Sequence, residues 1–302
     1  MMMGEEAIAL RMEAIKNLAI HAQFISAISD DLEVIIQEIE KADSEYRLVA
    51  YEGVSMMLAK KDFYEGNGLS RWNAFLERID ACYLDHAYIG LGWAVAKTKN
   101  FSSSILRGIQ DSMMHRVLDG RGYFDGIFQP RQSWMLKQHP PDIDETRVSA
   151  YYQGIGRSLL YHCLGSPEKV AAIIIGFPPE RQQDLWRGVG IAVLVVGGFN
   201  KEMLDYTRKI AFPNHLQLAV GAVIAAKGRV QLKAMTHSCL LVSETWCQRS
   251  PQDCFFLVKK IEKDIPPEAD FFQSLISGIL HELSKAPVSR NLWEMNGFKA
   301  GR

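Results

Sequence analysis

The segment from Tyr151 to Phe199, YYQGIGRSLLYHCLGSPEKVAAIIIGFPPERQQDLWRGVGIAVLVVGGF, carries one short pattern twice. The pattern is an aromatic residue, one variable residue and a glycine, followed by an apolar run. A period near 34 residues is typical of stacked helix–turn–helix units, and the glycines of successive copies along the chain lie 37, 36, 28 and 34 residues apart. The five copies are Tyr51-Glu52-Gly53, Tyr88-Ile89-Gly90, Phe124-Asp125-Gly126, Tyr152-Gln153-Gly154 and Trp186-Arg187-Gly188.

A second feature repeats at nearly the same interval. Phe177 and Phe212 each end an apolar run and precede a proline, 35 positions apart. Proline is favoured in the first turn of a helix, so both sites indicate the entry to a following helix. We therefore predict an all-α fold, in which antiparallel helical-hairpin repeats form a curved array or an α/α toroid.

The runs VAAIIIGF and GIAVLVVGG leave one rival fold open. Both are rich in valine and isoleucine and have the composition of buried strands in a parallel sheet. Helices are favoured because the equivalent positions of other copies, VSMMLAKK, LGWAVAKT and IGRSLLYH, are poor strand formers. A glycine inside a helix costs about 1 kcal/mol relative to alanine. Close approach of a neighbouring backbone would explain its recurrence.

The chain divides into three predicted parts. Residues 1–44 form N-terminal capping helices, residues 45–235 the helical-repeat core, and residues 236–302 C-terminal helices and a tail. Residues 5–28 and 32–42 have helical spacing of apolar residues, with Ser29 and Asp30 as the expected cap between them. The Pro-rich loop 129–148 interrupts the array, which makes it the expected mobile or substrate-facing segment.

Composition excludes several classes of protein. The formal net charge is −1, with 34 basic and 35 acidic residues interspersed, so the chain lacks the basic footprint of a nucleic-acid-binding protein. Five scattered cysteines fit a reducing compartment. The longest apolar run, residues 189–199, is well short of the roughly 20 residues that a membrane span needs. The N-terminus lacks the pattern of a signal peptide. We expect a cytoplasmic protein without a transmembrane span.

The middle residues of the triplets are the first candidate site. Four of the five are polar, which predicts either a hydrogen-bonded row inside the protein or the wall of a cavity, because an unpaired buried polar group is costly. In a cavity, burial would raise the pKa of a carboxyl group and make it a general acid. We assign catalysis to Asp125 and Glu52. Substrate binding is assigned to Gln153 and Arg187 and to the triplet aromatics, Tyr51, Tyr88, Phe124, Tyr152 and Trp186.

Three further features admit both a functional and a structural reading. Arg157 suits capture of a carboxylate or phosphate, or an internal ion pair. His86 is a candidate proton shuttle, or a histidine bonded within the fold. Asp142-Ile143-Asp144-Glu145 is similar to the Asp-x-Asp-Asp acid motif of class II terpene cyclases, while either aspartate also suits a helix cap.

Other chemistry finds no support in the sequence. His237, Cys239, Cys247 and Cys254 lack the spacing of a zinc site, and no metal is predicted. Gly154-Ile155-Gly156 and Gly188-Val189-Gly190 lack the remainder of a dinucleotide fingerprint, so no cofactor is predicted.

The segments AYEGVSMMLA, HAYIGLGWAVA, YYQGIGRSLLYHC, FPPERQQDLWRGVGIA and LAVGAVIAAK together resemble a bacterial family of unknown function described as enediyne biosynthesis proteins. The likeness covers roughly residues 46–235 and is most specific at Gln153-Gly154-x-Gly156-Arg157 and Pro178-Pro179-x-Arg181. It implies a role in bacterial specialised metabolism, and no catalytic residue is carried over from it.

Two functions remain open at this stage. In the first, the chain binds an apolar polyene, polyketide or isoprenoid in a helical cavity and cyclises or tailors it, as an acid–base cyclase, isomerase or lyase. In the second, the chain is a non-catalytic helical-repeat scaffold that binds a partner biosynthetic protein. An enclosed apolar cavity reached by Asp125, Arg157 and Arg187 would favour the first.

Overall fold

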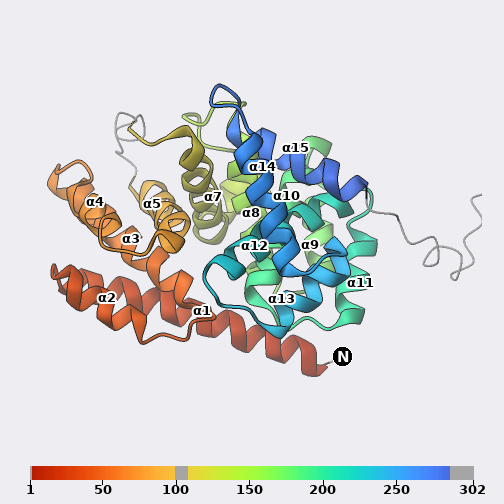
Figure 1. Cartoon of the computed structure of the whole chain (residues 1–302), viewed down its shortest axis with the longest axis horizontal. Helices are drawn as coiled ribbons and strands as arrows, with labels where there is room; N and C mark the ends of the chain where they lie inside the picture. Colours follow the sequence, from red (N-terminus) through yellow and green to blue (C-terminus); the bar gives the residue numbers. More distant parts are fainter. Residues whose placement is uncertain (1, 99–107, 286–302) are drawn as a thin grey trace, which may run out of the picture.

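The computed structural model describes residues 2–98 and 108–285, and these residues form helices without a strand (Figure 1). The all-helical prediction is confirmed. The rival reading of a parallel sheet is wrong, because VAAIIIGF lies in and just after α9 and GIAVLVVGG in and just after α10. The helices are α1 (Met2–Ile28), α2 (Leu32–Glu40), α3 (Arg47–Glu65), α4 (Ser70–Leu76), η1 (Ala81–Tyr83), α5 (Leu84–Lys97), α7 (Asp111–Phe128), η2 (Arg131–Met135), α8 (Val148–His162), α9 (Pro167–Ile174), α10 (Pro179–Val196), α11 (Lys201–Ile210), α12 (His215–Gln231), α13 (His237–Val242), η3 (Ser243–Cys247), α14 (Pro251–Asp264) and α15 (Phe271–Ser284).

The central helices pack side by side in chain order: α3, α5, α7, α8, α10 and α12. Hydrogen bonds join residues 34 positions apart between α3 and α5, between α7 and α8, and between α8 and α10. The same offset recurs towards the other helix ends, where Arg229 of α12 bonds the Val195 carbonyl of α10. A constant offset along the helices means that these neighbours run parallel, with the intervening segments returning the chain. The regular helical-hairpin repeat and the α/α toroid stay predictions.

Other helices cover this central set. The long α1 packs against α3 and reaches α10, and it runs along the lower edge of the molecule in Figure 1. Helix α14 packs on α12, and α15 contacts α12, α14 and α7. The C-terminal helices therefore bring residues from the end of the sequence against α7, which lies in its middle.

Glycine sets the spacing of the central helices. A Cβ atom on Gly154 would lie well under 3.0 Å from the Asp119 carbonyl of α7, and one on Gly156 would lie equally close to the Leu185 carbonyl of α10. The first glycine of each Gly-x-Gly pair thus faces the preceding helix and the second faces the following one. Gly90 and Gly92, Gly120 and Gly122, and Gly188 and Gly190 repeat the arrangement. The predicted close approach of backbones is confirmed.

This geometry corrects the third triplet. In α7 the glycine that meets the preceding helix is Gly120, which lies against Ile89, whereas Gly126 faces the Ser158 side chain of α8. The equivalent middle residue is therefore Asp119 and not Asp125. With Gly120 in place, the glycines at 53, 90, 120, 154, 188 and 221 are separated by 37, 30, 34, 34 and 33 residues. The apparent gap of 28 residues came from the wrong register.

Helix ends mostly follow local chemistry. The α2 cap is Asp31, whose carboxylate accepts from the backbone N–H groups of Glu33 and Val34, so the expected cap at Ser29 and Asp30 was early. Gly66 ends α3 in the left-handed conformation, with φ 71°, and Pro179 occupies the first turn of α10, as the sequence indicates.

The loop 129–148 is anchored to the core. Ser133 of η2 is buried, the Trp134 indole donates to the Gly126 carbonyl, and Arg121 holds Asp142 with bonds of 2.7 and 2.9 Å. Asp144 accepts from the backbone N–H groups of Thr146 and Arg147 in the turn before α8. The predicted helix cap is wrong, because the N-cap of α8 is Arg147 and no side chain caps this helix. The predicted C-terminal tail, residues 291–302, and residues 101–107 of the third unit lie outside the described residues.

Candidate functional site

A row of buried polar side chains crosses four central helices. Gln153 donates to Asp119 at 2.5 Å, and Arg187 donates from Nε to Gln153 at 2.7 Å and from Nη1 to Gln217 at 3.1 Å. We call Asp119, Gln153, Arg187 and Gln217 the polar row. Each of its members is at most 7% exposed. Of the two readings that the triplets left open, the structure shows the hydrogen-bonded row.

Two ion pairs complete the charges around the polar row. Arg187 pairs with Asp184 at 2.8 Å, and Arg157 pairs with Asp119 at 2.5 Å while its guanidinium lies 5.0 Å from the centre of the Tyr123 ring. Burial opposes the charge on Arg157, but Asp119 and Glu52 together outweigh it and the pKa of Arg157 is raised. The internal ion pair is thus the arrangement found for Arg157, and the acid that it contacts is Asp119.

Glu52 and His86 form a separate pair. The Glu52 carboxylate of α3 lies 2.9 Å from Nδ1 of His86 at the start of α5, and Glu52 is 2% exposed. The equivalent residue of α5 is the apolar Ile89. Glu52 and His86 thus make one hydrogen bond to each other inside the protein, and a role in catalysis stays a prediction.

Asp125 lies outside the polar row, next to Tyr151. Its carboxyl group accepts from the Tyr151 hydroxyl at 3.0 Å and from the Gln129 amide at 3.0 Å, and the residue is 6% exposed. Burial raises the pKa of Asp125 to about 6, against the lowering effects of Tyr151 and Arg121. A carboxyl group with such a pKa is suited to proton transfer near neutral pH.

Asp125→Asn should flatten the pH dependence of stability. Because the folded pKa of about 6 exceeds the ordinary 3.8, the folded chain binds more protons between these values, and its stability falls as pH rises through this window. Asparagine cannot ionise, so the variant should gain on the order of 2 kcal/mol on the wild type between pH 4 and pH 7. Urea unfolding at several pH values checks this. If the free energy of unfolding changed with pH in the same way for both proteins, burial would not raise the pKa of Asp125.

The aromatic residues of the triplets pack in separate parts of the protein. Tyr51 stacks on Tyr83 at 3.8 Å, Tyr88 meets Trp72 edge-on at 5.1 Å, and the Tyr152 hydroxyl donates to the Lys137 carbonyl. Phe124 packs on Phe128, and Trp186 is 3% exposed. The structure does not bring these rings together around one pocket, because successive triplets sit on different helices and their aromatics pack into different interhelical spaces.

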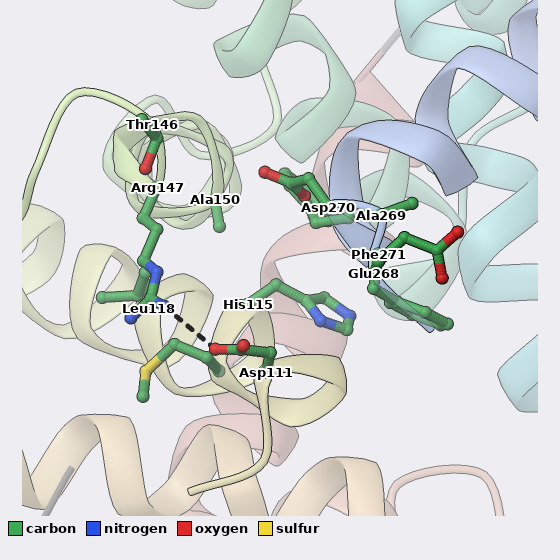
Figure 2. A pocket seen from close by; sticks show the side chains of 12 residues that line it. Asp111, His115, Leu118, Thr146, Arg147, Ala150, Glu268, Ala269, Asp270 and Phe271 are labelled. Carbon is green, nitrogen blue, oxygen red and sulfur yellow. Dashed lines mark hydrogen bonds and ion pairs between the residues drawn. The ribbon is translucent and has the colours of Figure 1, made fainter. Parts of the chain in front are cut away.

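A pocket of about 250 Å³ lies elsewhere, between α7, α8 and the start of α15 (Figure 2). Met114, Leu118 and the Phe271 and Phe272 rings give it apolar walls, and Asp111 pairs with Arg147 across it at 2.9 Å. None of the residues predicted for the site lines it. The lining residues are Asp111, Met114, His115, Leu118, Thr146, Arg147, Ala150, Glu268, Ala269, Asp270, Phe271 and Phe272.

His115 is the unusual residue of this pocket. It is only 6% exposed, it stacks on Phe272 at 5.1 Å, and neither ring nitrogen forms a well-oriented hydrogen bond. Burial lowers the pKa of His115 well below its usual value, and Arg116 lowers it further, while Asp85 and the Ser112 backbone act weakly in the opposite direction. The imidazole is therefore neutral at physiological pH, and both of its ring nitrogens are buried away from solvent.

A charged cluster lies behind His115. Asp85 of α5 bonds Arg116 at 3.0 Å and lies 3.5 Å from Lys227 of α12, which is also 3.3 Å from Glu262 of α14. Burial raises the pKa of Asp85, but Arg116 and Lys227 outweigh it and the net shift is downward. The positive charges of Arg116 and Lys227 are balanced by the negative charges of Asp85 and Glu262. The cluster ties the C-terminal helix α14 to α5 and α7 and supports the back of the pocket.

Sequence reasoning missed the pocket. His115 stands in DSMMHRVL, where nothing marks it as different from a core histidine, and the residues that face it come from more than 150 positions later. The acidic stretch Glu268-Ala269-Asp270 before two phenylalanines was the one local signal available.

Neither a metal-binding cluster nor a membrane-spanning helix is found among the described residues. No group of three or more His, Cys, Asp or Glu side chains within 2–98 and 108–285 is arranged to hold a metal ion. Among the same residues, no helix has both the length and the apolar character that a membrane span requires.

Comparison with known proteins gives the family. No curated protein and no solved structure matches the chain. A family model described as protein of unknown function (DUF1702) matches residues 2–272, which include the central helices, the pocket and the start of α15. Because the match covers most of the 302 residues, the chain belongs to this family of proteins of unknown function.

Proposed function

We propose that the chain binds an apolar polyene, polyketide or isoprenoid intermediate of bacterial specialised metabolism and cyclises or tailors it by acid–base chemistry. The site is the pocket between α7, α8 and α15. One observation carries the proposal: a buried, neutral imidazole without a hydrogen-bond partner borders a pocket that is lined by both apolar and charged side chains. The likeness to enediyne biosynthesis proteins supports the choice of metabolism.

The size of the pocket limits what it holds. Sites for drug-sized ligands typically measure about 300–1,000 Å³, and this one measures about 250 Å³. It therefore accommodates one ring or one short segment of a longer intermediate. Glu268 and Asp270 are exposed at its rim, so the remainder of a long ligand would extend into solvent.

His115 is the residue assigned to proton transfer. A neutral imidazole accepts a proton from a carbon or hydroxyl acid and returns it at a second position, which is the chemistry of an isomerase, a lyase or a cyclase. The exposed Asp111–Arg147 pair lies at the same pocket. Asp125, with its raised pKa, does not line this pocket, and its assignment as a second acid stays a prediction.

The runner-up is a scaffold that binds a partner biosynthetic protein. The observation in its favour is a stripe of exposed apolar side chains on α1, where Ile20, Phe24 and Ile28 are 56%, 60% and 70% exposed. Residues four positions apart share one face of a helix. Such a stripe is a typical docking surface for another helix.

His115→Phe tests the catalytic proposal. Phenylalanine retains the stacking on Phe272 and removes the unpaired polar atoms, so the thermal transition should stay within a few degrees of that of the wild type. Native mass spectrometry of wild-type protein from its producing cell should show a retained small molecule, and the variant should lose both this molecule and the pathway product.

The control for this experiment is His281→Phe, the same substitution at an exposed histidine of α15 that lies outside the pocket. It should behave like the wild type. If the His115 variant keeps full product formation, the acid–base role is wrong and the scaffold becomes the better reading.

A further inference from the structure

Helix α1 stacks on the central helices as a further member of the set. Between neighbouring central helices, the carbonyl that meets the contact glycine belongs to the residue just before the contact glycine of its own helix. Glu52, for example, directly precedes Gly53, and its carbonyl meets Gly90 of α5. Gly53 in turn meets the Ala19 carbonyl of α1. The residue of α1 that is equivalent to these glycines is therefore Ile20.

The face of α1 that contains Ile20 is apolar and open. In the central helices this position packs against the preceding helix, whereas in α1 it faces outward along the lower edge of the molecule in Figure 1. Ile20, Phe24 and Ile28 are 56%, 60% and 70% exposed, and their spacing puts them on one face. We call these three residues the α1 stripe. The outermost helix of a stack normally has a polar outer face, so the α1 stripe indicates a covering partner.

The α1 stripe has the area of a weak and reversible contact. Three side chains with these exposed fractions present on the order of 400 Å² of apolar surface. Two copies that cover each other would bury on the order of 800 Å² of it, and the flanking polar residues would bring the total to about 1,000 Å², the lower limit of a specific interface. Self-association through the stripe is thus expected at micromolar concentrations.

The charges on the two sides of the α1 stripe have opposite signs. Lys16 stands eight residues before Phe24, and Asp30 and Asp31 stand six and seven residues after it, all of them exposed. Asp30 pairs with Lys61 at 2.8 Å, yet 70% of its side chain remains exposed and open to a second cation. An antiparallel second copy would bring its Lys16 to these acids and to the negative end of the α1 dipole.

A parallel arrangement of two α1 helices is disfavoured. It would place Glu13 beside Glu13 and Lys16 beside Lys16, and it would align the two helix dipoles. In the antiparallel arrangement, Ile20 of each copy faces Ile28 of the other, and Phe24 faces Phe24. The apolar residues then meet only apolar residues, and the cation meets acids.

We propose that two copies of the chain associate through the α1 stripe, with their α1 helices antiparallel and Phe24 on the two-fold axis. Ile20 of each copy packs on Ile28 of the other, and Lys16 of each approaches Asp30 of the other. No residue of α1 lines the pocket between α7, α8 and α15, so the dimer is independent of the proposed function. It gives the stripe a different occupant from the partner protein of the runner-up function.

Sedimentation velocity of the full chain tests the dimer. Between about 1 and about 200 µM, the monomer should convert to a dimer. Phe24→Glu should weaken the association at least about tenfold, because two carboxylates would face each other across the axis and the central apolar contact would be lost. Its thermal transition should not change, since Phe24 is exposed. The control is Phe256→Glu on α14, a phenylalanine that is 67% exposed outside the stripe, and it should leave the association unchanged.

Cysteine variants test the antiparallel arrangement. A mixture of Ile20→Cys and Ile28→Cys chains should form a disulfide-linked dimer when treated with diamide. Either variant alone should cross-link no more than the wild type, because two copies of one position would lie about 12 Å apart along the helices, too far for a disulfide. Treatment of the wild type gives the background from the native cysteines, of which Cys82 is partly exposed.

Each measurement has a result that would overturn the proposal. A chain that stays monomeric at the highest concentration would overturn the dimer and leave the α1 stripe to a partner protein. Equal weakening by Phe24→Glu and Phe256→Glu would show that the contact lies elsewhere. Efficient cross-linking of Ile20→Cys chains by themselves would show that the helices are parallel and would overturn the antiparallel pairing.

Discussion

Gly154→Ala is expected to lower the free energy of unfolding by at least about 3 kcal/mol, and to prevent folding if the wild type is only marginally stable. The added Cβ would fall well under 3.0 Å from the Asp119 carbonyl oxygen and the Tyr123 amide nitrogen of α7. Both are backbone atoms inside a buried helix, so neither can move without shifting α7. Overpacking is normally relieved by rotation of a side chain, and here no side chain is available to rotate.

The control lies in another central helix. Gly228 of α12 has no atom within 4 Å of the Cβ position, and it stands inside a helix. Gly228→Ala should therefore raise the free energy of unfolding by up to about 1 kcal/mol, since alanine is the better helix former. Chemical unfolding followed by circular dichroism measures both variants. Similar values for the two would show that α7 and α8 do not touch through their backbones.

The second large effect is expected at Arg187. Arg187→Met keeps the length of the side chain and removes bonds to Ser149, Gln153, Asp184 and Gln217, all of them buried. Asp184 then remains as a buried carboxylate that has lost its inner partner. Breaking a buried ion pair on one side costs about 3–5 kcal/mol, and we expect a loss in this range.

Arg181→Met is the comparison, because Arg181 also contacts Asp184, at 3.3 Å, but is itself 19% exposed against 2% for Arg187. Its removal should cost less than that of Arg187, since its shorter ion pair, at 2.8 Å, is to the exposed Glu145 and Asp184 keeps Arg187. The same unfolding measurement applies. If Arg187→Met proves as mild as Arg181→Met, the polar row is not a stabilising network and its members regain standing as ligand-binding residues.

Both effects rest on residues that the sequence marked, Gly154 for close packing of backbones and Arg187 for substrate binding. The recurring aromatic-x-glycine triplet correctly selected Gly53, Gly90, Gly154 and Gly188, because close packing of parallel helices demands glycine at one place in each. In α7 the same pattern selected Gly126 in place of Gly120. Three glycines stand within seven residues there, and only the neighbouring helices decide which of them meets α5.

This shift of register explains why Asp125 does not lie with Gln153 and Arg187 in the polar row. Asp125 was taken for the partner of Gln153 and Arg187, whereas the polar row contains Asp119. Asp125 still has the raised pKa expected of a buried carboxyl group, since burial acts on it in either position. A period in the sequence predicts that equivalent residues lie together, but it cannot distinguish two candidates six residues apart that both precede a glycine.

The sequence alone determined the helical class, some of the helix ends and the places where backbones meet, because these depend on local propensity, on proline and glycine, and on a period written along the chain. Only the tertiary structure decided the candidate site. His115 and Arg147 meet Glu268 and Phe271 because α15 returns to α7 across the central helices, and no local interaction records a contact between segments so far apart. Whether a polar side chain is satisfied or free depends on such contacts, and in this protein that difference separates Arg187 from His115.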